Sequence, residues 1–213
     1  MRIVLTNDDG FGSLGIETVR EIVKEFGEVF VFAPSSPQSG MSCGFTTYRK
    51  PITVHKVDDH NFKVDGTPVD CVLFANAYLQ GNYDMIISGC NHGYNMSNDT
   101  MYSGTCGACA QGLVFKKKCI AFSADQFEDD KHIKEYIPKV FKFLLEKDLL
   151  SGDFYWNVNL HPESARMFTY FCKAVGIEIF CSAPRRKFIK SEINCVSTRI
   201  YGCNRTVFAP SRG

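Results

Sequence analysis

The sequence predicts an α/β fold in which a mostly parallel sheet lies between two layers of helices. Short apolar runs alternate with amphipathic helical patterns along residues 1–160. Polar loops that contain glycine follow several of these runs, and 213 residues are enough for one sizeable core. We therefore expect a single domain over residues 1–213, with its core at about 1–160 and a truncated or divergent tail at 161–213.

The first part of the core predicts two strands, a helix and a small β excursion. Residues 2–6 (RIVLT) and 28–33 (EVFVFA) are apolar runs that read as buried strands. Residues 15–26 carry apolar side chains at three- and four-residue spacing, which is typical of an amphipathic helix. Segments 52–57 and 61–64 flank a turn-like sequence and predict the β excursion.

The rest of the chain continues the alternation. Thr67 and Pro68 provide an N-cap and a first-turn proline, so we expect a helix over residues 67–78. Further strands are expected at residues 85–88, 119–123 and 156–160, and further helices at 105–115 and 133–145. In the tail, residues 175–181 and 193–201 have the composition of strands. This order is typical of a Rossmann-like three-layer α/β/α fold.

Composition excludes several classes of protein. The formal net charge is +1 and the basic runs are short, so we expect no nucleic-acid polymer as a partner. We also expect no membrane partner and a cytoplasmic location, because no long apolar stretch and no secretory signal are visible. Ten cysteines are present, and Cys106 and Cys109 have metal or redox spacing. Core packing is favoured for them, since no second pair is evident.

Two acidic residues, Asp8 and Asp9, stand side by side directly after the first predicted strand, and Gly10 follows them. Neighbouring side chains of a strand point to opposite faces, so the two carboxylates share a ligand only where the backbone turns. Adjacent carboxylates repel each other, and a divalent cation removes that repulsion. Oxygen ligands favour Mg²⁺, Mn²⁺ or Ca²⁺. A plain polar turn with a helix-capping acid is the alternative.

Two more polar loops are expected at the same edge of the sheet, because ligands bind at the carboxyl ends of parallel strands. Ser39 lies in the loop after the second strand, and Asn91 lies in the loop after residues 85–88. Two carboxylates already balance a divalent cation, so neutral oxygens suit the rest of its coordination shell if an anionic substrate must approach.

Residues 102–105 (YSGT) come directly before a predicted helix of small residues. A helix N-terminus offers free N–H groups and a positive dipole end, and Ser103 and Thr105 add hydroxyls, a combination that suits phosphate. The segment is not a Walker loop, because no Gly-Lys-Ser/Thr is present. A plain N-cap at Ser103 or Thr105 is the alternative.

Together these segments resemble the SurE family, the stationary-phase survival proteins. The matching stretches are RIVLTNDDGFGSLGI, VFAPSSPQSGMS, DGTPVDCV, DMIISGCNHGYNMSNDTMYSGTCGA and WNVNL. They occur in family order across roughly the first three quarters of the chain.

The resemblance implies a phosphomonoesterase that hydrolyses nucleoside 5′- and 3′-monophosphates with one divalent cation, Mg²⁺ or Mn²⁺, per subunit. The metal ligands that it implies are Asp8, Asp9, Ser39 and Asn91. The phosphate-binding residues that it implies are Asn95, Ser103, Gly104 and Thr105. It also implies a homodimer or homotetramer in which C-terminal elements are exchanged between subunits.

The sequence departs from the family's pattern in two places. Ser97 stands where the family usually has glycine. The sequence ends at VFAPSRG, without the strand resembling GYVSITPL and the final helix of other members, which bears on pocket closure and on the exchanged-arm oligomer.

Asp8 and Asp9 are the expected catalytic residues, because either can orient or deprotonate the attacking water. Direct attack by Asp8 to give a phospho-enzyme is the less favoured variant. His92 is interpreted as a solvent-facing residue rather than as the proton donor to the leaving oxygen. Two other classes stay open: a non-catalytic nucleotide- or metal-binding relative, and a phospho-receiver domain. A receiver needs a further aspartate, which VFVFAPSS does not offer.

Overall fold

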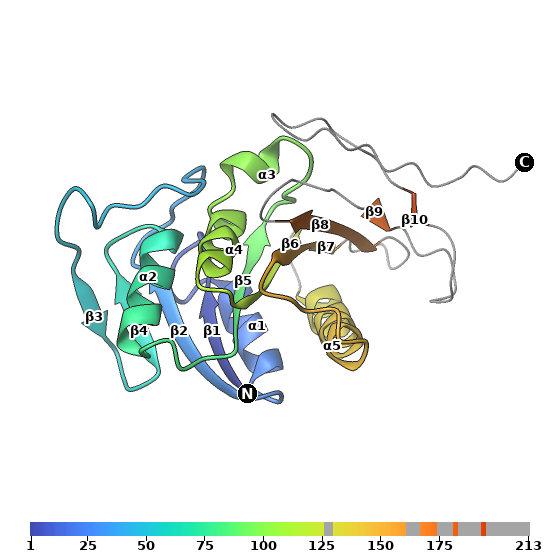
Figure 1. Ribbon diagram of the computed structural model, residues 1–213, viewed down its shortest axis with the longest axis horizontal. Coiled ribbons are helices and arrows are strands. Elements are labelled where there is room, and N and C mark those ends of the chain that lie inside the picture. The colour runs from blue at the N-terminus through green and yellow to red at the C-terminus, as the bar shows by residue number, and fades with distance from the viewer. Residues whose placement is uncertain (126–129, 161–166, 174–180, 183–192, 195–213) are drawn as a thin grey trace, which may run out of the picture.

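The computed structural model describes residues 1–125, 130–160, 167–173, 181–182 and 193–194 (Figure 1). The parallel part of its sheet consists of β1 (Arg2–Thr6), β2 (Glu28–Pro34), β4 (Asn61–Val64), β5 (Met85–His92), β6 (Lys118–Ala124) and β7 (Phe154–Leu160). The antiparallel edge strands are β3 (Val54–Lys56), β8 (Met167–Lys173), β9 (Cys181–Ser182) and β10 (Ile193–Asn194). The order across the sheet is β10-β9-β8-β7-β6-β5-β1-β2-β4-β3.

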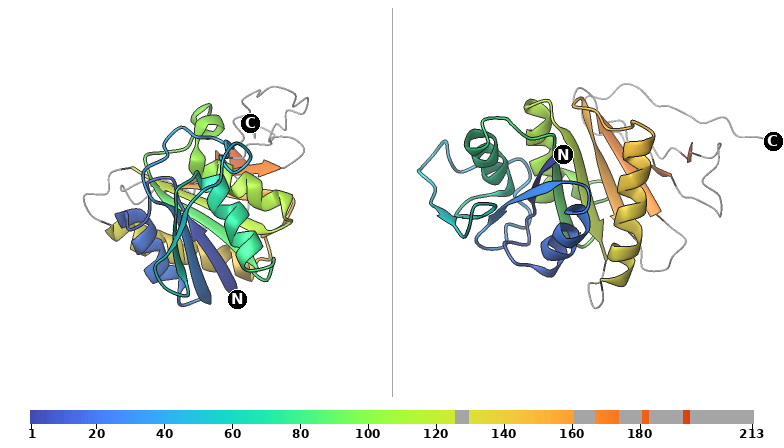
Figure 2. Two further views of the ribbon diagram at one scale, coloured as in Figure 1. Left: turned by 90° about the vertical axis from the view of Figure 1, so that its left-hand side faces the viewer. Right: turned by 90° about the horizontal axis from the view of Figure 1, so that it is seen from below.

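Helices cover both faces of the sheet (Figure 2). Helices α1 (Leu14–Val23) and α5 (Lys131–Glu146) pack on one face, and α2 (Pro68–Tyr78) and α4 (Gly104–Val114) pack on the other. Each face has its own apolar core, because the buried strands present side chains to both sides. The predicted three-layer α/β/α fold is therefore confirmed.

Helix α2 shows how the local sequence sets an element in place. The Thr67 side chain accepts a hydrogen bond from the Asp70 N–H, and the Asp70 carboxylate accepts one from the Thr67 N–H at 2.9 Å. Asp70 also accepts bonds from the backbone N–H groups of Thr46 and Thr47, which ties the segment before β3 to this helix start. The N-cap predicted from Thr67-Pro68 is confirmed as a capping box.

Several predicted bounds differ from the observed ones. Helix α1 ends at Val23, and a turn follows it where the apolar spacing predicted helix to residue 26. A short helix, α3 (Asp99–Tyr102), stands inside a segment predicted as loop, and β8 was not predicted. The predicted tail strands 175–181 and 193–201 lie outside the described residues, except for residue 181 in β9 and residues 193–194 in β10.

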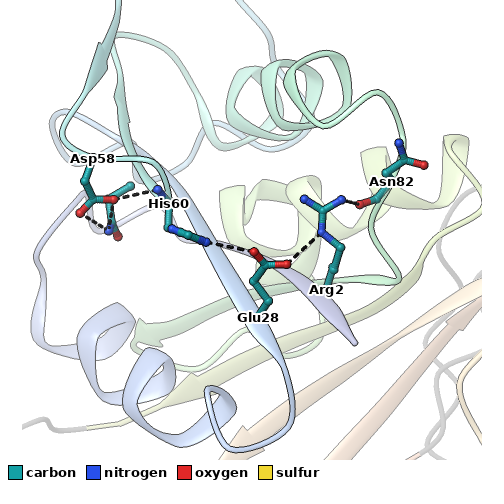
Figure 3. A network of polar contacts seen from close by, with 6 residues as sticks. Arg2, Glu28, Asp58, His60 and Asn82 are labelled. Carbon is teal, nitrogen blue, oxygen red and sulfur yellow. Dashed lines mark hydrogen bonds and ion pairs between the residues drawn. The ribbon is translucent and has the colours of Figure 1, made fainter.

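Charged side chains link the amino-terminal ends of β1 and β2 to the turn between β3 and β4 (Figure 3). Arg2 donates to the Asn82 carbonyl oxygen at 2.6 Å and to Glu28 Oε2 at 3.1 Å. Glu28 Oε1 lies 3.1 Å from His60 Nε2, and the His60 N–H donates to Asp58 Oδ1 at 2.8 Å. This network lies at the end of the sheet opposite to the loops that follow the strands, so its charges are separate from the polar site described next.

Candidate active site

A crevice is expected where the strand order changes direction. From β1 the chain passes to β2 and β4 on one side, and it then returns to β5 on the other side of β1. Helix α1 follows β1, and α4 follows β5 after the short α3; α1 and α4 lie on opposite faces of the sheet. The region beyond the carboxyl ends of β1 and β5 is therefore the topological switch point, where ligands bind in open parallel sheets.

The turn after β1 is held by Asn7. This residue is fully buried, and its Nδ2 donates to the Gly10 carbonyl oxygen at 2.9 Å and to Ser13 Oγ at 2.8 Å. Gly10 has φ +99°, a conformation that favours glycine. Strand β1 ends at Thr6, so Asp8 and Asp9 both belong to the turn.

Asp8 contacts the first turn of α4. The Thr105 hydroxyl donates to Asp8 Oδ1 at 2.6 Å, and the Thr105 N–H donates to Asp8 Oδ2 at 3.3 Å. Asp8 is 5% exposed, and burial raises the pKa of its carboxyl, while the bonds from Thr105 lower it in part. A Cβ on Gly104 would lie 3.0 Å from Asp8 Cβ, so glycine is what allows this close approach.

Asp9 lies beside the end of β5. Its Oδ2 accepts a hydrogen bond from the backbone N–H of His92 at 3.1 Å. Burial raises the pKa of the Asp9 carboxyl, the bond from His92 lowers it, and the charge of Asp8 raises it further. Ionisation of both carboxyls therefore costs more in the protein alone than in water, and a cation between them would offset that cost.

The end of β5 is irregular, and this irregularity places Asn91. The pairing register with β6 shifts between Ser88 and Asn91. Gly89 has φ +119°, and a Cβ there would lie 2.1 Å from the Phe122 carbonyl oxygen. The Asn91 Nδ2 donates to the Gly93 carbonyl oxygen at 2.8 Å, which leaves Oδ1 as the atom suited to a cation.

The loop after β2 reaches this site through its main chain. The Gln38 N–H donates to the Asp8 carbonyl oxygen at 2.7 Å, and the Phe11 N–H donates to the Pro34 carbonyl oxygen at 2.8 Å. Ser39, next to Gln38, is exposed, and no hydrogen bond joins it to the two carboxylates. The structure thus brings the three predicted loops together. Ser39 is connected to Asp8 indirectly, because the backbone N–H of the preceding residue, Gln38, donates to the Asp8 carbonyl oxygen.

The predicted phosphate residues Ser103, Gly104 and Thr105 lie at the start of α4. Ser103 is the N-cap, and its Oγ accepts from the Cys106 N–H at 3.1 Å, so the plain N-cap expected as an alternative is present. The hydroxyl and the N–H of Thr105 both donate to Asp8, which couples the carboxylate to the helix N-terminus.

Asn95 is buried, and it bonds to three residues that the sequence did not single out: Ser123, Asn157 and Asn159. The sequence WNVNL could have indicated that Asn157 and Asn159 are buried polar residues. Two asparagines two residues apart share one face of a strand, and a central strand of a covered sheet buries both faces.

The structure also places the cysteine pair, His92 and Ser97, which the sequence singled out. Cys106 and Cys109 lie on α4 and are buried in the apolar core, as predicted. The His92 side chain is exposed. Ser97 has φ 52°, the left-handed region, which accounts for the glycine expected there.

Within the described ranges, no three His, Cys, Asp or Glu side chains gather closely enough to hold a metal. The predicted ligand set has only two carboxylates, so this result does not bear on it. None of the described helices combines the length and apolarity needed to cross a membrane.

The fold and the site define a Rossmann-like α/β protein with two carboxylates beside a helix N-terminus at the switch point. The chain belongs to the SurE family: the family described as "Survival protein SurE" matches residues 3–179.

Individual relatives agree with this assignment. The chain is 38% identical to "5'-nucleotidase SurE" of Campylobacter curvus over 180 residues, which are 78% of this chain and 69% of that protein. It is 40% identical to "5'/3'-nucleotidase SurE" of Wigglesworthia glossinidia brevipalpis over 156 residues, 72% of this chain and 60% of that protein. The crystal structure of the SurE protein from Aquifex aeolicus matches with a TM-score of 0.69 at 35% identity, covering 76% of this chain and 66% of that one.

Proposed function

We propose that this chain is a divalent-metal-dependent phosphomonoesterase that hydrolyses nucleoside 5′- and 3′-monophosphates to nucleoside and phosphate. The observation that carries the proposal is the meeting of Asp8, Asp9 and the end of β5 beside the N-terminus of α4. The relatives that match this chain carry the names "5'-nucleotidase SurE" and "5'/3'-nucleotidase SurE", which supports the reaction class.

The residues present suit Mg²⁺ or Mn²⁺. Both carboxyl pKa values are raised by burial, and the amide of Asn91 keeps its oxygen for a ligand. We propose Asp8, Asp9, Ser39 and Asn91 as the residues that would hold one such ion. When bound, it would supply charge neutralisation for a phosphoryl group and activation of a water.

The protein's own groups have separate roles in this proposal. The N-terminus of α4, with Ser103, Gly104 and Thr105, and the side chain of Asn95 would hold the phosphate oxygens. Both oxygens of Asp8 accept bonds from Thr105, whereas among the described residues one oxygen of Asp9 accepts a hydrogen bond, from His92. Asp9 is therefore better placed to orient the water and accept its proton.

The test is phosphate release by the purified full-length chain, stripped with EDTA and reloaded with Mn²⁺ or Mg²⁺. We expect turnover of 5′-AMP, 3′-AMP and p-nitrophenyl phosphate with added metal and none in EDTA. Binding of AMP without turnover under any metal would instead favour the non-catalytic relative and overturn the proposal.

Two further expectations accompany the enzyme. We propose a cytoplasmic location, which free cysteines in the described part of the chain suit. We also propose a homodimer or homotetramer, to be measured by light scattering coupled to size-exclusion chromatography. A monomer at micromolar concentration would contradict it.

A further inference from the structure

A group of buried polar side chains lies beside the candidate site, between β5, β6 and β7. Asn95 is 6% exposed, Asn157 is 1% exposed, and Ser123 and Asn159 are fully buried. Burying amides and hydroxyls costs free energy unless they are hydrogen-bonded. The bonds that these groups make converge on one residue, Asn95.

The main chain of Asn95 is held by side chains of β7. Asn159 Oδ1 accepts from the Asn95 N–H at 2.8 Å. Asn157 Nδ2 donates to the Asn95 carbonyl oxygen at 2.8 Å, and Asn159 Nδ2 donates to the same oxygen at 3.2 Å. A distant strand therefore satisfies both backbone groups of a loop residue, which fixes that loop to the sheet.

The Asn95 side chain is held by β6. Its Nδ2 donates to Ser123 Oγ at 2.9 Å and carries a second hydrogen, since an amide nitrogen has two. Ser123 pairs in register with Asn91 of β5 and with Asn159 of β7, so these residues form one row at the carboxyl end of the sheet. One end of the row is Asn91, a proposed metal ligand, and the other end is Asn159, which bonds to the backbone of Asn95.

We propose that Asn157, Asn159 and Ser123 form an amide clamp, a set of positioning residues that aims the remaining Nδ2 hydrogen of Asn95 at a phosphate oxygen of the substrate. This inference rests on the proposed function. An asparagine is required at position 159 because its side chain both accepts from the N–H and donates to the carbonyl oxygen of Asn95. Aspartate lacks the donor, and leucine lacks both groups.

The competing explanation is that the clamp only stabilises the fold. The two explanations predict different effects of a clamp substitution when Asn95 is also replaced. If the clamp positions the Asn95 amide, the substitution has no further effect on substrate binding once that amide is gone, whereas a loss of stability persists. The test therefore compares Asn157→Leu and Ser123→Ala, each in the wild-type background and in an Asn95→Ala background. Ser123→Ala removes a single hydroxyl and serves if Asn157→Leu does not fold.

Activity is measured with p-nitrophenyl phosphate in Mn²⁺, together with the inhibition constant of inorganic phosphate. We expect each substitution to raise KM and the inhibition constant about tenfold, within the roughly 10- to 100-fold range of supporting residues. In the Asn95→Ala background the same substitutions should change both constants less than about twofold.

Val158→Ala is the matched control, since Val158 stands between the two asparagines but packs in the opposite core. It should lower Tm and leave KM unchanged. Equal losses with and without Asn95 in an active enzyme would overturn the clamp. An inactive wild-type enzyme would instead overturn the proposed function.

Discussion

Asp8–Asp9 and Asp58–Asp59 are both adjacent pairs of aspartates, yet their surroundings act on them in opposite directions. Burial raises the pKa of both Asp8 and Asp9. The His60 N–H lowers the pKa of Asp58, the Lys56 side chain lowers that of Asp59, and both residues are exposed. The surroundings thus favour ionisation of the exposed pair, part of which Figure 3 shows, and oppose ionisation of Asp8 and Asp9.

The difference shows what the site requires. Where hydrogen bonds and a neighbouring lysine already favour the ionised carboxylates, as at Asp58 and Asp59, no cation is needed to offset a cost of burial. The Asp8–Asp9 pair accepts bonds from Thr105 and His92, but these do not compensate for its burial. The chain retains an unfavourable charge distribution there, which is typical of functional sites.

The largest difference between the pairs should appear in activity. Asp8→Asn keeps an acceptor for Thr105 but removes a charge, so we expect kcat/KM for AMP in Mn²⁺ to fall by about three orders of magnitude or more. Asp58→Asn, at the other end of the sheet, should leave it unchanged. Circular dichroism establishes that both variants fold. Hydrolysis retained in folded Asp8→Asn would remove Asp8 from the mechanism.

A smaller loss is expected when Asp8 is displaced but not replaced. Gly104→Ala places a Cβ 3.0 Å from Asp8 Cβ and 3.1 Å from Pro68 Cγ, so the carboxylate must shift. A Cβ at this distance requires Asp8 to shift by a few tenths of an ångström. Misplacement by about 1 Å costs roughly 100-fold in rate, so we expect this smaller shift to cost about tenfold or less. Gly104 is helical, and alanine suits a helix, so stability should change little. Full activity would mean that the position of Asp8 is not critical.

The strands and helices could be predicted from the sequence, whereas the long-range contacts of the site could not. Apolar runs and the Thr67-Pro68 start signal identified strands and helices, because these patterns are local. The meeting of Asp9 with His92 depends on the register shift at Gly89, and the pairing of Asn95 with Asn157 and Asn159 joins residues more than 60 positions apart. Such contacts follow from the order of strands in the sheet, which no local pattern encodes.

Without metal, neutralising one aspartate should raise the Tm when it belongs to the Asp8–Asp9 pair and should not raise it when it belongs to the Asp58–Asp59 pair. Because burial and Asp8 raise the pKa of Asp9, its ionised form destabilises the fold at neutral pH, and Asp9→Asn should raise Tm in EDTA by about 1–3 °C. Asp59→Asn, which loses a contact with Lys56, should not raise it. Differential scanning calorimetry measures both. Added Mn²⁺ should raise the Tm of the wild type more than that of Asp9→Asn, and the reverse order would contradict the assignment of Asp9.

The smallest effect concerns pH. The folded pKa of Asp58 lies below its usual value of 3.8, so its ionised form stabilises the protein above that pH, and the contribution is lost as pH falls through the folded pKa. Asp58→Asn should therefore lower Tm at pH 7 by about 1 °C or less, because the group is exposed, and the difference should vanish under strong acid. For Asp9→Asn in EDTA the gain in Tm should disappear at a higher pH, since the raised pKa protonates Asp9 first. Parallel Tm–pH curves for the two variants would mean that the two pairs are electrostatically alike.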